Sequence, residues 1–320
     1  MSIVTLNAAD AEPVSFDGSQ TATRYILRAL SGWLGSPDAK VNLVERANGD
    51  GAHDVPASTI SYAARTVSVE YRLLPRDAHG RDELLAMQDS VRAFLHKHVR
   101  VRVRDETMDT YCDGYVAQLT MGENVQNVNR QTQTGTIDIV CARPEILSTQ
   151  VQSGQMLPSQ VNVGGGGLSY NPSGLLTYWT GEPNNSPSVL VSNTLVGTSG
   201  LRYPLTYMTV ERVEQPNQVT LTNRGTSDAY PVFVCNGPMP DGVDLVVEGT
   251  GLWLRCSQPV YGTPLVLDSR SRTATVGGLD VSRTLVSRGF PVVPAGGSIT
   301  VTLRTTGTGW VDASMHDTWM

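Results

Sequence analysis

The hydrophobic and polar residues alternate along much of the sequence, and this pattern predicts a chain built mainly of β-strands. In residues 263–279, Leu265 and Leu267 face one side of a predicted strand, and a second alternating run covers residues 272–276. Gly277-Gly278 after the second run can supply the positive φ angles of a tight hairpin turn. Two successive hairpins predict a meandering antiparallel sheet, and its apolar face needs a second layer to cover it.

The pattern on both sides of this stretch supplies the second layer. Short alternating runs recur, with Gly, Pro or Asn between them. This spacing favours a β-sandwich or jelly roll. The other predicted strands of the C-terminal block are residues 218–222, 230–236, 243–248, 253–256, 298–305 and 311–319.

The N-terminal half is also rich in predicted strands, but it contains one helix. Residues 65–73 alternate cleanly, with Val67, Val69 and Tyr71 on one face. Residues 82–98 instead repeat their apolar side chains at helical spacing. That stripe consists of Leu84, Met87, Val91 and Phe94 or Leu95. Further strands are predicted at residues 3–6, 24–30, 41–46, 99–104, 110–119 and 135–142.

A change of composition divides the chain. Residues 148–199 are interrupted repeatedly by Gly, Pro and Asn, including the run Gly164–Gly167. We interpret this segment as a linker or irregular insert. It separates an N-terminal domain, residues 1–147, from a C-terminal domain, residues 200–320, and we expect the two domains to fold separately.

The charge and the cysteines narrow the classes of function. The formal charge is −6, from 24 basic and 30 acidic residues, which argues against binding nucleic acid through phosphates. No apolar run is long enough to span a membrane, and no signal peptide is expected, so we expect synthesis in a reducing cytoplasm. Cys112, Cys141, Cys235 and Cys256 lack metal-ligand spacing. They are expected to be buried thiols, with a Cys235–Cys256 disulfide as the alternative.

Alternating charges mark one predicted strand. Residues 99–104 place valines inward and Arg100, Arg102 and Arg104 on one exposed face, where we expect ion pairs between subunits, with phosphate contact as the alternative. The acidic series that follows lacks the ligand alternation of a calcium loop, so a solvated hairpin tip is favoured over a cation site. The series consists of Asp105, Glu106, Asp109 and Asp113.

No catalytic motif is found, and no cofactor is expected. The sequence contains no nucleophile elbow, P-loop, zinc site or kinase signature, and no carboxylate pair suggests a glycosidase. Trp253, Tyr261 and Trp310 are candidates for stacking on a sugar ring, although packing at the core or edge of the sandwich is the simpler use. The sequence therefore predicts a structural or binding protein and not an enzyme.

Motifs in the C-terminal block resemble those of phage distal tail (Dit-like) and minor tail proteins. The departures are His316, where an arginine is usual, and residues 275–278, where an Asn-Gly turn is commoner. The N-terminal order of strand, connection, helix and paired strands also fits, with less specific motifs. The matching residues are 202–206 (RYPLT), 222–226 (TNRGT), 230–233 (YPVF), Gly237-Pro238, 251–254, Gly262, Leu265, Leu267-Asp268, Arg272-Thr273, 294–297 (PAGG) and 317–319.

The resemblance implies a structural part at the tip of a long, non-contractile phage tail. In that family the N-terminal domain forms a hexameric ring and the C-terminal domain is a galectin-like sandwich. The implied partners are further copies of the chain, the major tail tube protein, a tail hub or tail-associated lysin-type protein, and other tail-tip or receptor-binding proteins. The implied location is the virion, after assembly in the host cytoplasm.

Two expectations about interactions depend on these interpretations. We expect the ring to form through the N-terminal domain, because an open sheet leaves unpaired edges and residues 47–56 are a flexible arm that could reach a neighbour. The alternative function is a carbohydrate-binding adhesion protein that contacts the host surface through the C-terminal sandwich. Trp253, Tyr261 and Trp310 on one concave surface would favour that alternative.

Overall fold

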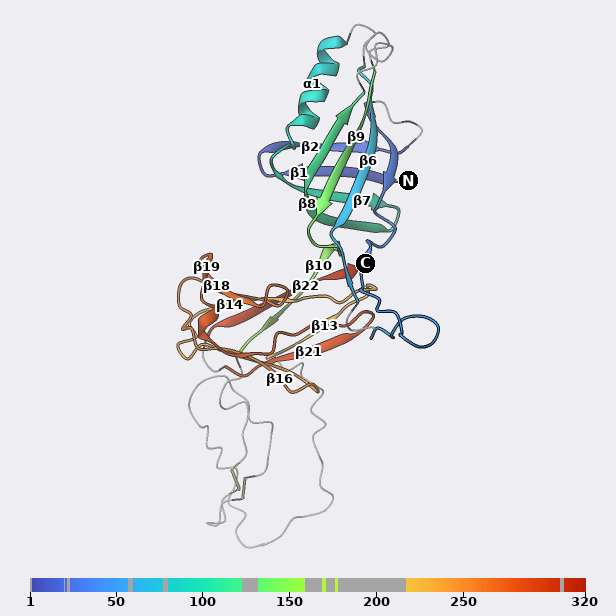
Figure 1. The fold of residues 1–320 in the computed structure, drawn as a ribbon. Helices are drawn as coiled ribbons and strands as arrows, with labels where there is room; N and C mark the ends of the chain where they lie inside the picture. Colours follow the sequence, from blue (N-terminus) through green and yellow to red (C-terminus); the bar gives the residue numbers. More distant parts are fainter. Residues whose placement is uncertain are drawn as a thin grey trace, which may run out of the picture.

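The computed structural model describes most of the chain. The described residues are 2–19, 21, 24–56, 60–76, 80–122, 132–158, 169–170, 176–177, 217–305 and 308–320. They form two β-rich units, one above the other in Figure 1, with a single α-helix at the far end of the N-terminal unit. The predicted mainly-β fold class is confirmed.

The N-terminal unit is a closed β-barrel of seven strands. The strands follow one another in the order β8-β7-β1-β2-β3-β6-β9, and β8 also pairs with β9, which closes the circle. Their bounds are β1 Ser2–Ala8, β2 Ala11–Asp17, β3 Tyr25–Ser31, β6 Arg65–Leu73, β7 His98–Asp105, β8 Met108–Met121 and β9 Gln133–Cys141.

Alternating side chains fill the barrel, as the sequence predicts. Val67, Val69 and Tyr71 of β6 point inward and are almost completely buried, and the valines of β7 do the same. Apolar residues of β1, β2 and β9 complete one contiguous core. The alternation of side chains along each strand therefore determines which residues form the core of the barrel.

Closure of the barrel corrects the expectation of an open sheet. Each of the seven strands has a hydrogen-bonded neighbour on both sides, although β2 and β3 share only the Asp17–Ile26 bridge. A closed barrel leaves little sheet edge for a neighbouring subunit, and what is left lies along the seam between β2 and β3. The open sheet from which the ring contact was expected is therefore absent from the described residues, and a ring through the N-terminal unit stays a prediction.

The helix, α1 (Arg81–Arg92), starts where predicted and ends earlier. Its buried residues include Leu84, Met87 and Val91, which confirms the apolar stripe. The predicted continuation to residue 98 is wrong because the chain turns after Arg92, and His96 has φ of 60°, a left-handed conformation that no helix continues through. His98 already belongs to β7.

Phe94 lies just beyond the helix and anchors it to the barrel. Its side chain is buried within the same core as Leu84 and Val91. Replacing Phe94 by alanine should lower the free energy of unfolding by about 3 kcal/mol, because the change leaves a cavity under the helix. Urea denaturation measures this loss. Leu95→Ala is the control, since Leu95 is exposed; a loss below about 1 kcal/mol for Phe94→Ala would contradict the packing.

The C-terminal unit is a two-sheet sandwich, as predicted. One sheet has the strand order β13-β21-β15-β16-β20, and the other has the order β19-β18-β17-β14-β22-β10. Apolar residues from both sheets form a second core, separate from that of the barrel. The first sheet consists of β13 Gln218–Thr222, β21 Ser298–Leu303, β15 Val243–Val247, β16 Leu252–Cys256 and β20 Leu285–Arg288. The second consists of β19 Leu279–Asp280, β18 Thr273–Val276, β17 Leu265–Asp268, β14 Val232–Asn236, β22 Trp310–Trp319 and β10 Ile146–Met156.

The two predicted hairpins in residues 263–279 are confirmed. β17 pairs with β18 and β18 pairs with β19, both antiparallel. Gly277 and Gly278 have φ of 56° and 83° in the second turn, as their sequence suggests. Leu265 and Leu267 are completely buried in the core of the sandwich.

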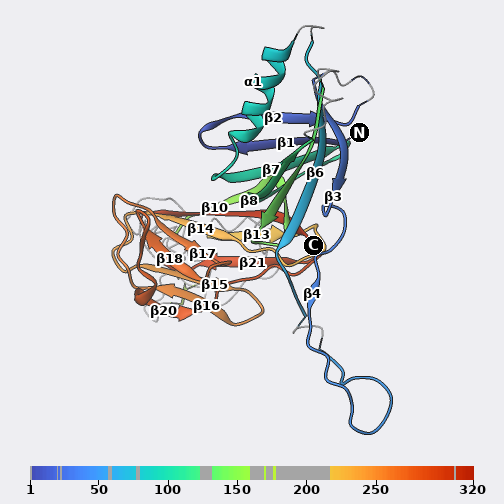
Figure 2. The same ribbon diagram turned by 45° about the horizontal axis from the view of Figure 1, so that its top comes forward.

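Strand β10 joins the two units and corrects the predicted linker. Residues 146–156 form one strand, so the predicted boundary between residues 147 and 148 lies inside it. At its start Leu147 pairs with Tyr111 of the barrel, and further along Val151 to Met156 pair with β22 of the sandwich. One hydrogen-bonded sheet therefore runs from the barrel into the sandwich (Figure 2).

Several smaller features complete the description. β4 (Ala39–Lys40) pairs with β5 (Ser61–Tyr62), β11 (Ser169–Tyr170) pairs with β12 (Leu176–Thr177), and Ser282–Thr284 form a short 3-10 helix. The predicted strand at residues 41–46 is wrong. The motif at residues 202–206 and most of the predicted linker, including Gly164–Gly167, lie outside the described residues. No helix in the described part of the chain is long and apolar enough to cross a membrane.

Candidate functional site

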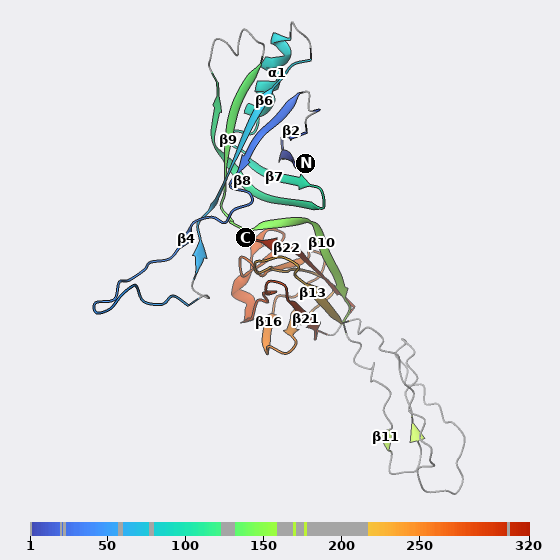
Figure 3. The ribbon, with the colours of Figure 1, turned by 90° about the vertical axis from the view of Figure 1, so that its right-hand side faces the viewer.

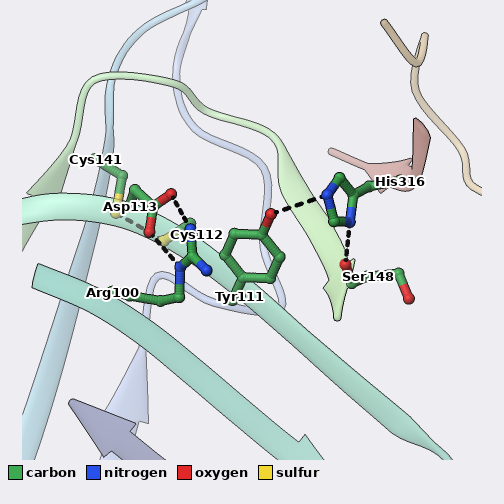
Figure 4. A network of polar contacts seen from close by, with 7 residues as sticks. All are labelled: Arg100, Tyr111, Cys112, Asp113, Cys141, Ser148 and His316. Atoms are coloured by element: carbon green, nitrogen blue, oxygen red, sulfur yellow. Dashed lines mark hydrogen bonds and ion pairs between the residues drawn. The ribbon is translucent and has the colours of Figure 1, made fainter. Parts of the chain in front are cut away.

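The junction between the barrel and the sandwich is held by polar side chains from both units. His316 of β22 lies between the Ser148 carbonyl and the Tyr111 hydroxyl (Figure 4). Nδ1 of His316 donates to the Ser148 oxygen at 2.8 Å, because a carbonyl can only accept. In the neutral imidazole Nε2 then accepts from Tyr111, at 3.4 Å. His316 thus ties the last strand to the barrel.

A second contact crosses the same junction. Arg270, in the turn after β17, forms an ion pair with Glu145 at 2.8 Å, and its guanidinium carbon lies 4.8 Å from the centre of the Tyr230 ring. Glu145 directly precedes β10, so the pair fixes the sandwich against the start of the joining strand. A cavity of about 490 Å³ lies here, and Tyr111, Arg270 and His316 are among its lining residues.

The row of arginines on β7 faces outward, as the alternation predicts, but two of its members have partners in their own chain. Arg100 forms two hydrogen bonds with Asp113, of 2.7 and 2.9 Å, and Arg102 is hydrogen-bonded to Asp109. The hydrogen bonds from Arg102 hold the pKa of Asp109 below its ordinary value. Ion pairs of Arg100 and Arg102 with another subunit are therefore not needed to balance their charges. Arg104 is exposed and has no ion pair within the described residues.

The acidic residues of this series belong to the β7–β8 hairpin, and this hairpin supplies partners for Asp109 and Asp113. Strands β7 and β8 pair so that Arg100 lies opposite Asp113 and Arg104 lies opposite Asp109. Asp105 accepts a hydrogen bond from the Ser2 hydroxyl at 3.0 Å. Among the residues that the structure describes, no three histidine, cysteine, aspartate or glutamate side chains are grouped as metal ligands would be.

The three candidate aromatic residues do not line the cavity at the junction. Trp253 on β16 lies beneath the guanidinium of Arg304, with 5.2 Å between guanidinium carbon and ring centre. Trp310 begins β22 and donates its indole N–H to Asp312 at 3.0 Å. Tyr261 is exposed in the loop after β16. A role of these side chains in sugar binding stays a prediction.

All four cysteines are free and buried, and the alternative Cys235–Cys256 disulfide is not formed. The two sulfur atoms that approach one another are those of Cys112 and Cys141, at 2.7 Å. The sequence gives no signal for this pair, because the two residues meet only where β8 and β9 close the barrel.

A long arm leaves the molecule between β3 and β6. We define the arm as residues 34–56 and 60–62. The short β4–β5 ladder lies near its base, and the arm extends away from both units (Figure 3). Backbone hydrogen bonds such as His53 N to Val44 O, at 2.9 Å, hold its outer part as a hairpin. Exposed apolar side chains are spread along it, namely Leu34, Leu43, Val44 and Ile60. The sequence predicted only the turn-rich tip of the arm.

Comparisons with known proteins find similarity in structure but not in sequence. No protein-family model matches the chain, and no curated protein matches it significantly. The crystal structure of SPP1 Dit (gp 19.1), described as a paradigm of the hub adsorption apparatus in Gram-positive infecting phages, matches with a TM-score of 0.57 and 10% identity over 99% of both chains. A chain of the phage p2 baseplate in its activated conformation with Sr matches with a TM-score of 0.50 and 10% identity over 98% of both chains.

These matches cover both units of the chain. Identity near 10% establishes a common fold and does not by itself transfer a function. The resemblance that the sequence motifs suggested is nevertheless confirmed at this level: the chain has the fold of a Dit-like phage distal tail protein.

Proposed function

We propose that this chain is a non-enzymatic structural component of a phage tail tip, and that six copies form a ring between the tail tube and the baseplate. The main support is the match to SPP1 Dit over 99% of both chains, which includes the barrel, the sandwich and their order. The sequence motifs of the C-terminal block point independently to the same family. The number six, the long non-contractile tail and the galectin-like character of the sandwich derive from that family resemblance.

The arm is the part of the chain best suited to a contact between subunits. The barrel offers little open edge, only the seam between β2 and β3, and the arginines of β7 are largely paired, so neither provides an obvious binding surface. The arm instead exposes apolar side chains on a segment that buries few of its own residues. Apolar groups on such an extension gain free energy when a neighbour covers them.

The direction of the arm also fits a head-to-tail contact. It leaves the molecule at the level of the junction between the units and reaches beyond the outline of both (Figure 3). A contact in which the arm of one copy lies on a different surface of the next copy is heterologous, and it closes into a ring when the rotation per subunit divides the circle. Partners above and below the ring, including the tail tube protein and a tail hub or receptor-binding protein, are part of the same proposal.

Substituting the apolar residues of the arm tests the proposal. We expect the intact chain to form hexamers of its 34.5 kDa subunit at micromolar concentration. The double variant Leu43→Ser/Val44→Ser should be monomeric under the same conditions, because the contact loses its apolar area. Both residues are exposed in the single chain, so the substitutions should change its stability by no more than about 0.5 kcal/mol. Light scattering coupled to size exclusion measures the mass.

A matched control is available on the sandwich. Leu279 and Val286 are 74% and 66% exposed, close to the 65% and 64% of Leu43 and Val44. Leu279→Ser/Val286→Ser should leave the hexamer intact. A chain that stays monomeric at all concentrations would contradict the ring, and a Leu43→Ser/Val44→Ser hexamer of unchanged stability would contradict the role of the arm.

A further inference from the structure

Two buried cysteines meet at the end of the barrel that faces the sandwich. Cys112 of β8 and Cys141 of β9 are 2% and 0% exposed, and their Sγ atoms are 2.7 Å apart (Figure 4). This separation is much nearer to a covalent S–S bond, about 2.0 Å, than to the spacing of unrelated side chains in a core. No other pair of cysteines in the described residues makes a sulfur–sulfur contact of this kind.

The backbone around the pair is built for this close approach. Gly114 lies two residues after Cys112 on β8, and a Cβ atom at that position would be 2.5 Å from the Val140 oxygen and 3.0 Å from Sγ of Cys141. A larger residue would therefore push β9 and its sulfur away. The absence of a side chain at Gly114 lets the two strands close together where the thiols meet.

A buried arginine accompanies the thiols. Arg65 of β6 pairs directly with Cys141 of β9, and neighbouring side chains of such a pair share one face of the sheet. Its Nε and Nη1 donate to backbone carbonyls, those of Pro144, Gly32, Trp33 and Gly35. Its Nη2 is buried without a hydrogen-bond partner, and Glu145, the carboxylate whose charge acts on Arg65, is itself ion-paired with Arg270. The positive charge is thus left without a direct counter-ion beside the sulfur atoms.

The two thiols are electrostatically unequal. The two thiols share a hydrogen bond, and this hydrogen bond, with the charge of Arg65, lowers the pKa of Cys141 despite its burial. The same hydrogen bond and burial raise the pKa of Cys112. A thiolate is the reactive form of cysteine, so Cys141 is the nucleophile of the pair and Cys112 keeps its proton.

We propose that Cys112 and Cys141 are a site of covalent modification, at which a small oxidant such as hydrogen peroxide converts the two thiols into a disulfide. The Cys141 thiolate attacks one peroxide oxygen, the O–O bond breaks, and the products are a sulfenic acid and hydroxide. The Cys112 sulfur then attacks the Cys141 sulfur and displaces its oxygen as water, with the thiol proton. The hydroxide takes up the proton that the Cys141 thiol released on ionisation, so two electrons pass from the thiols to the peroxide, which ends as two waters.

The cavity at the junction provides the access that this reaction needs. Cys112 is among its lining residues, together with Tyr111 and His316. A molecule the size of peroxide can therefore come next to Cys112 from the side of the sandwich. The sulfur of Cys141 does not line the cavity, but it lies 2.7 Å from that of Cys112. The disulfide would join β8 to β9 next to Tyr111, the residue through which the barrel contacts His316, and would fix the end of the barrel on which the sandwich is placed.

Oxidation of the full-length chain tests the inference. The reduced chain is treated with a small excess of hydrogen peroxide, free thiols are alkylated in denaturant, and peptides are identified by mass spectrometry. We expect a cross-linked peptide pair that contains Cys112 and Cys141, while Cys235 and Cys256 are alkylated. The melting midpoint should rise by roughly 5 °C on oxidation and fall again when a phosphine reductant is added.

Serine variants provide the control. Cys112→Ser should abolish both the cross-link and the rise in the midpoint, whereas Cys235→Ser, which removes an equally buried thiol in the sandwich, should leave both unchanged. The peptide result on the natural sequence does not depend on how well either variant folds. Alkylation of both Cys112 and Cys141 after oxidation, or their recovery as separate sulfinic or sulfonic acids, would overturn the proposal.

Discussion

Replacing Asn223 by alanine should lower the free energy of unfolding of the sandwich by about 5 kcal/mol. The side chain of Asn223 is completely buried and takes part in five hydrogen bonds with backbone groups. Its amide group donates to the carbonyls of Ser227, Val293 and Pro294, and its oxygen accepts from the N–H groups of Gly225 and Thr318. Alanine would leave the N–H groups of Gly225 and Thr318 and the carbonyl of Ser227 without this partner, and that loss costs more than the hydrogen bonds themselves contribute. The carbonyls of Val293 and Pro294 keep backbone donors, the N–H groups of Ala229 and Gly297.

Three segments that are distant in the sequence depend on this one side chain. It joins the turn after β13, the loop before β21 and the end of β22. Gly225 lies so close to β22 that a Cβ atom there would be 1.8 Å from the Thr318 oxygen. The motif of residues 222–226, through which the sequence resembles tail proteins, therefore has a structural use: it closes one end of the sandwich.

Urea denaturation followed by tryptophan fluorescence measures the effect, because Trp253, Trp310 and Trp319 all belong to the sandwich. Asn217→Ala is the matched control, since Asn217 is half-buried and donates one long hydrogen bond, of 3.3 Å, to Leu303. It should lose about 1 kcal/mol or less. Equal losses for the two variants would mean that the network around Asn223 does not stabilise the sandwich as described.

The sequence predicts the strands of this chain much better than it predicts how they join. Alternation places Val67, Val69 and Leu265 correctly because burial on one face of a strand is a local property. Closure of the barrel is different, because the alternating pattern is the same in an open and a closed sheet. The pairing of β8 with β9 closes the sheet, and no local feature of either strand's sequence predicts this pairing.

The sequence also fails to predict strand β10, because this strand has little hydrophobic pattern. Its sequence, ILSTQVQSGQM, is mostly polar, and only its first and last residues and Ser148 are buried. Such a strand is held by backbone hydrogen bonds to its neighbours and not by an apolar face of its own. Hydrophobic periodicity cannot detect such a strand, so the sequence indicates a linker from residue 148 onward.

Part of the candidate site can be predicted from the sequence. A hairpin with its turn at residues 106–107 places Arg100 opposite Asp113, so this ion pair follows from register alone. The pair of Arg102 with Asp109 does not, because Asp109 lies opposite Arg104 and is reached diagonally. The contact of Tyr111 with His316 is different, because it joins residues 205 positions apart across two units. The Cys112–Cys141 pair likewise exists only through closure of the barrel.

A fragment of residues 200–320 should fail to fold cooperatively, although its sequence alone suggested an independent domain. The fragment lacks β10, which forms the antiparallel ladder with β22 from Val151 to Met156. It also lacks Met156, which is completely buried in the core of the sandwich. Without β10, the long strand β22 becomes an edge with unpaired N–H and C=O groups, and the core beneath it is open to water.

A fragment of residues 143–320 should fold, because it restores this strand and adds Glu145, the partner of Arg270. Thermal unfolding followed by circular dichroism should therefore show a single sharp transition for residues 143–320 and none for residues 200–320. The comparison of the two fragments tests where the C-terminal unit begins: at the apolar strands after residue 200, or at the polar strand β10, which is joined to it by hydrogen bonds. If the shorter fragment melts as sharply and at the same temperature, β10 only connects the two units. If it shows no transition, the sandwich cannot fold without β10, although this strand is mostly polar and adds only Met156 to the buried core.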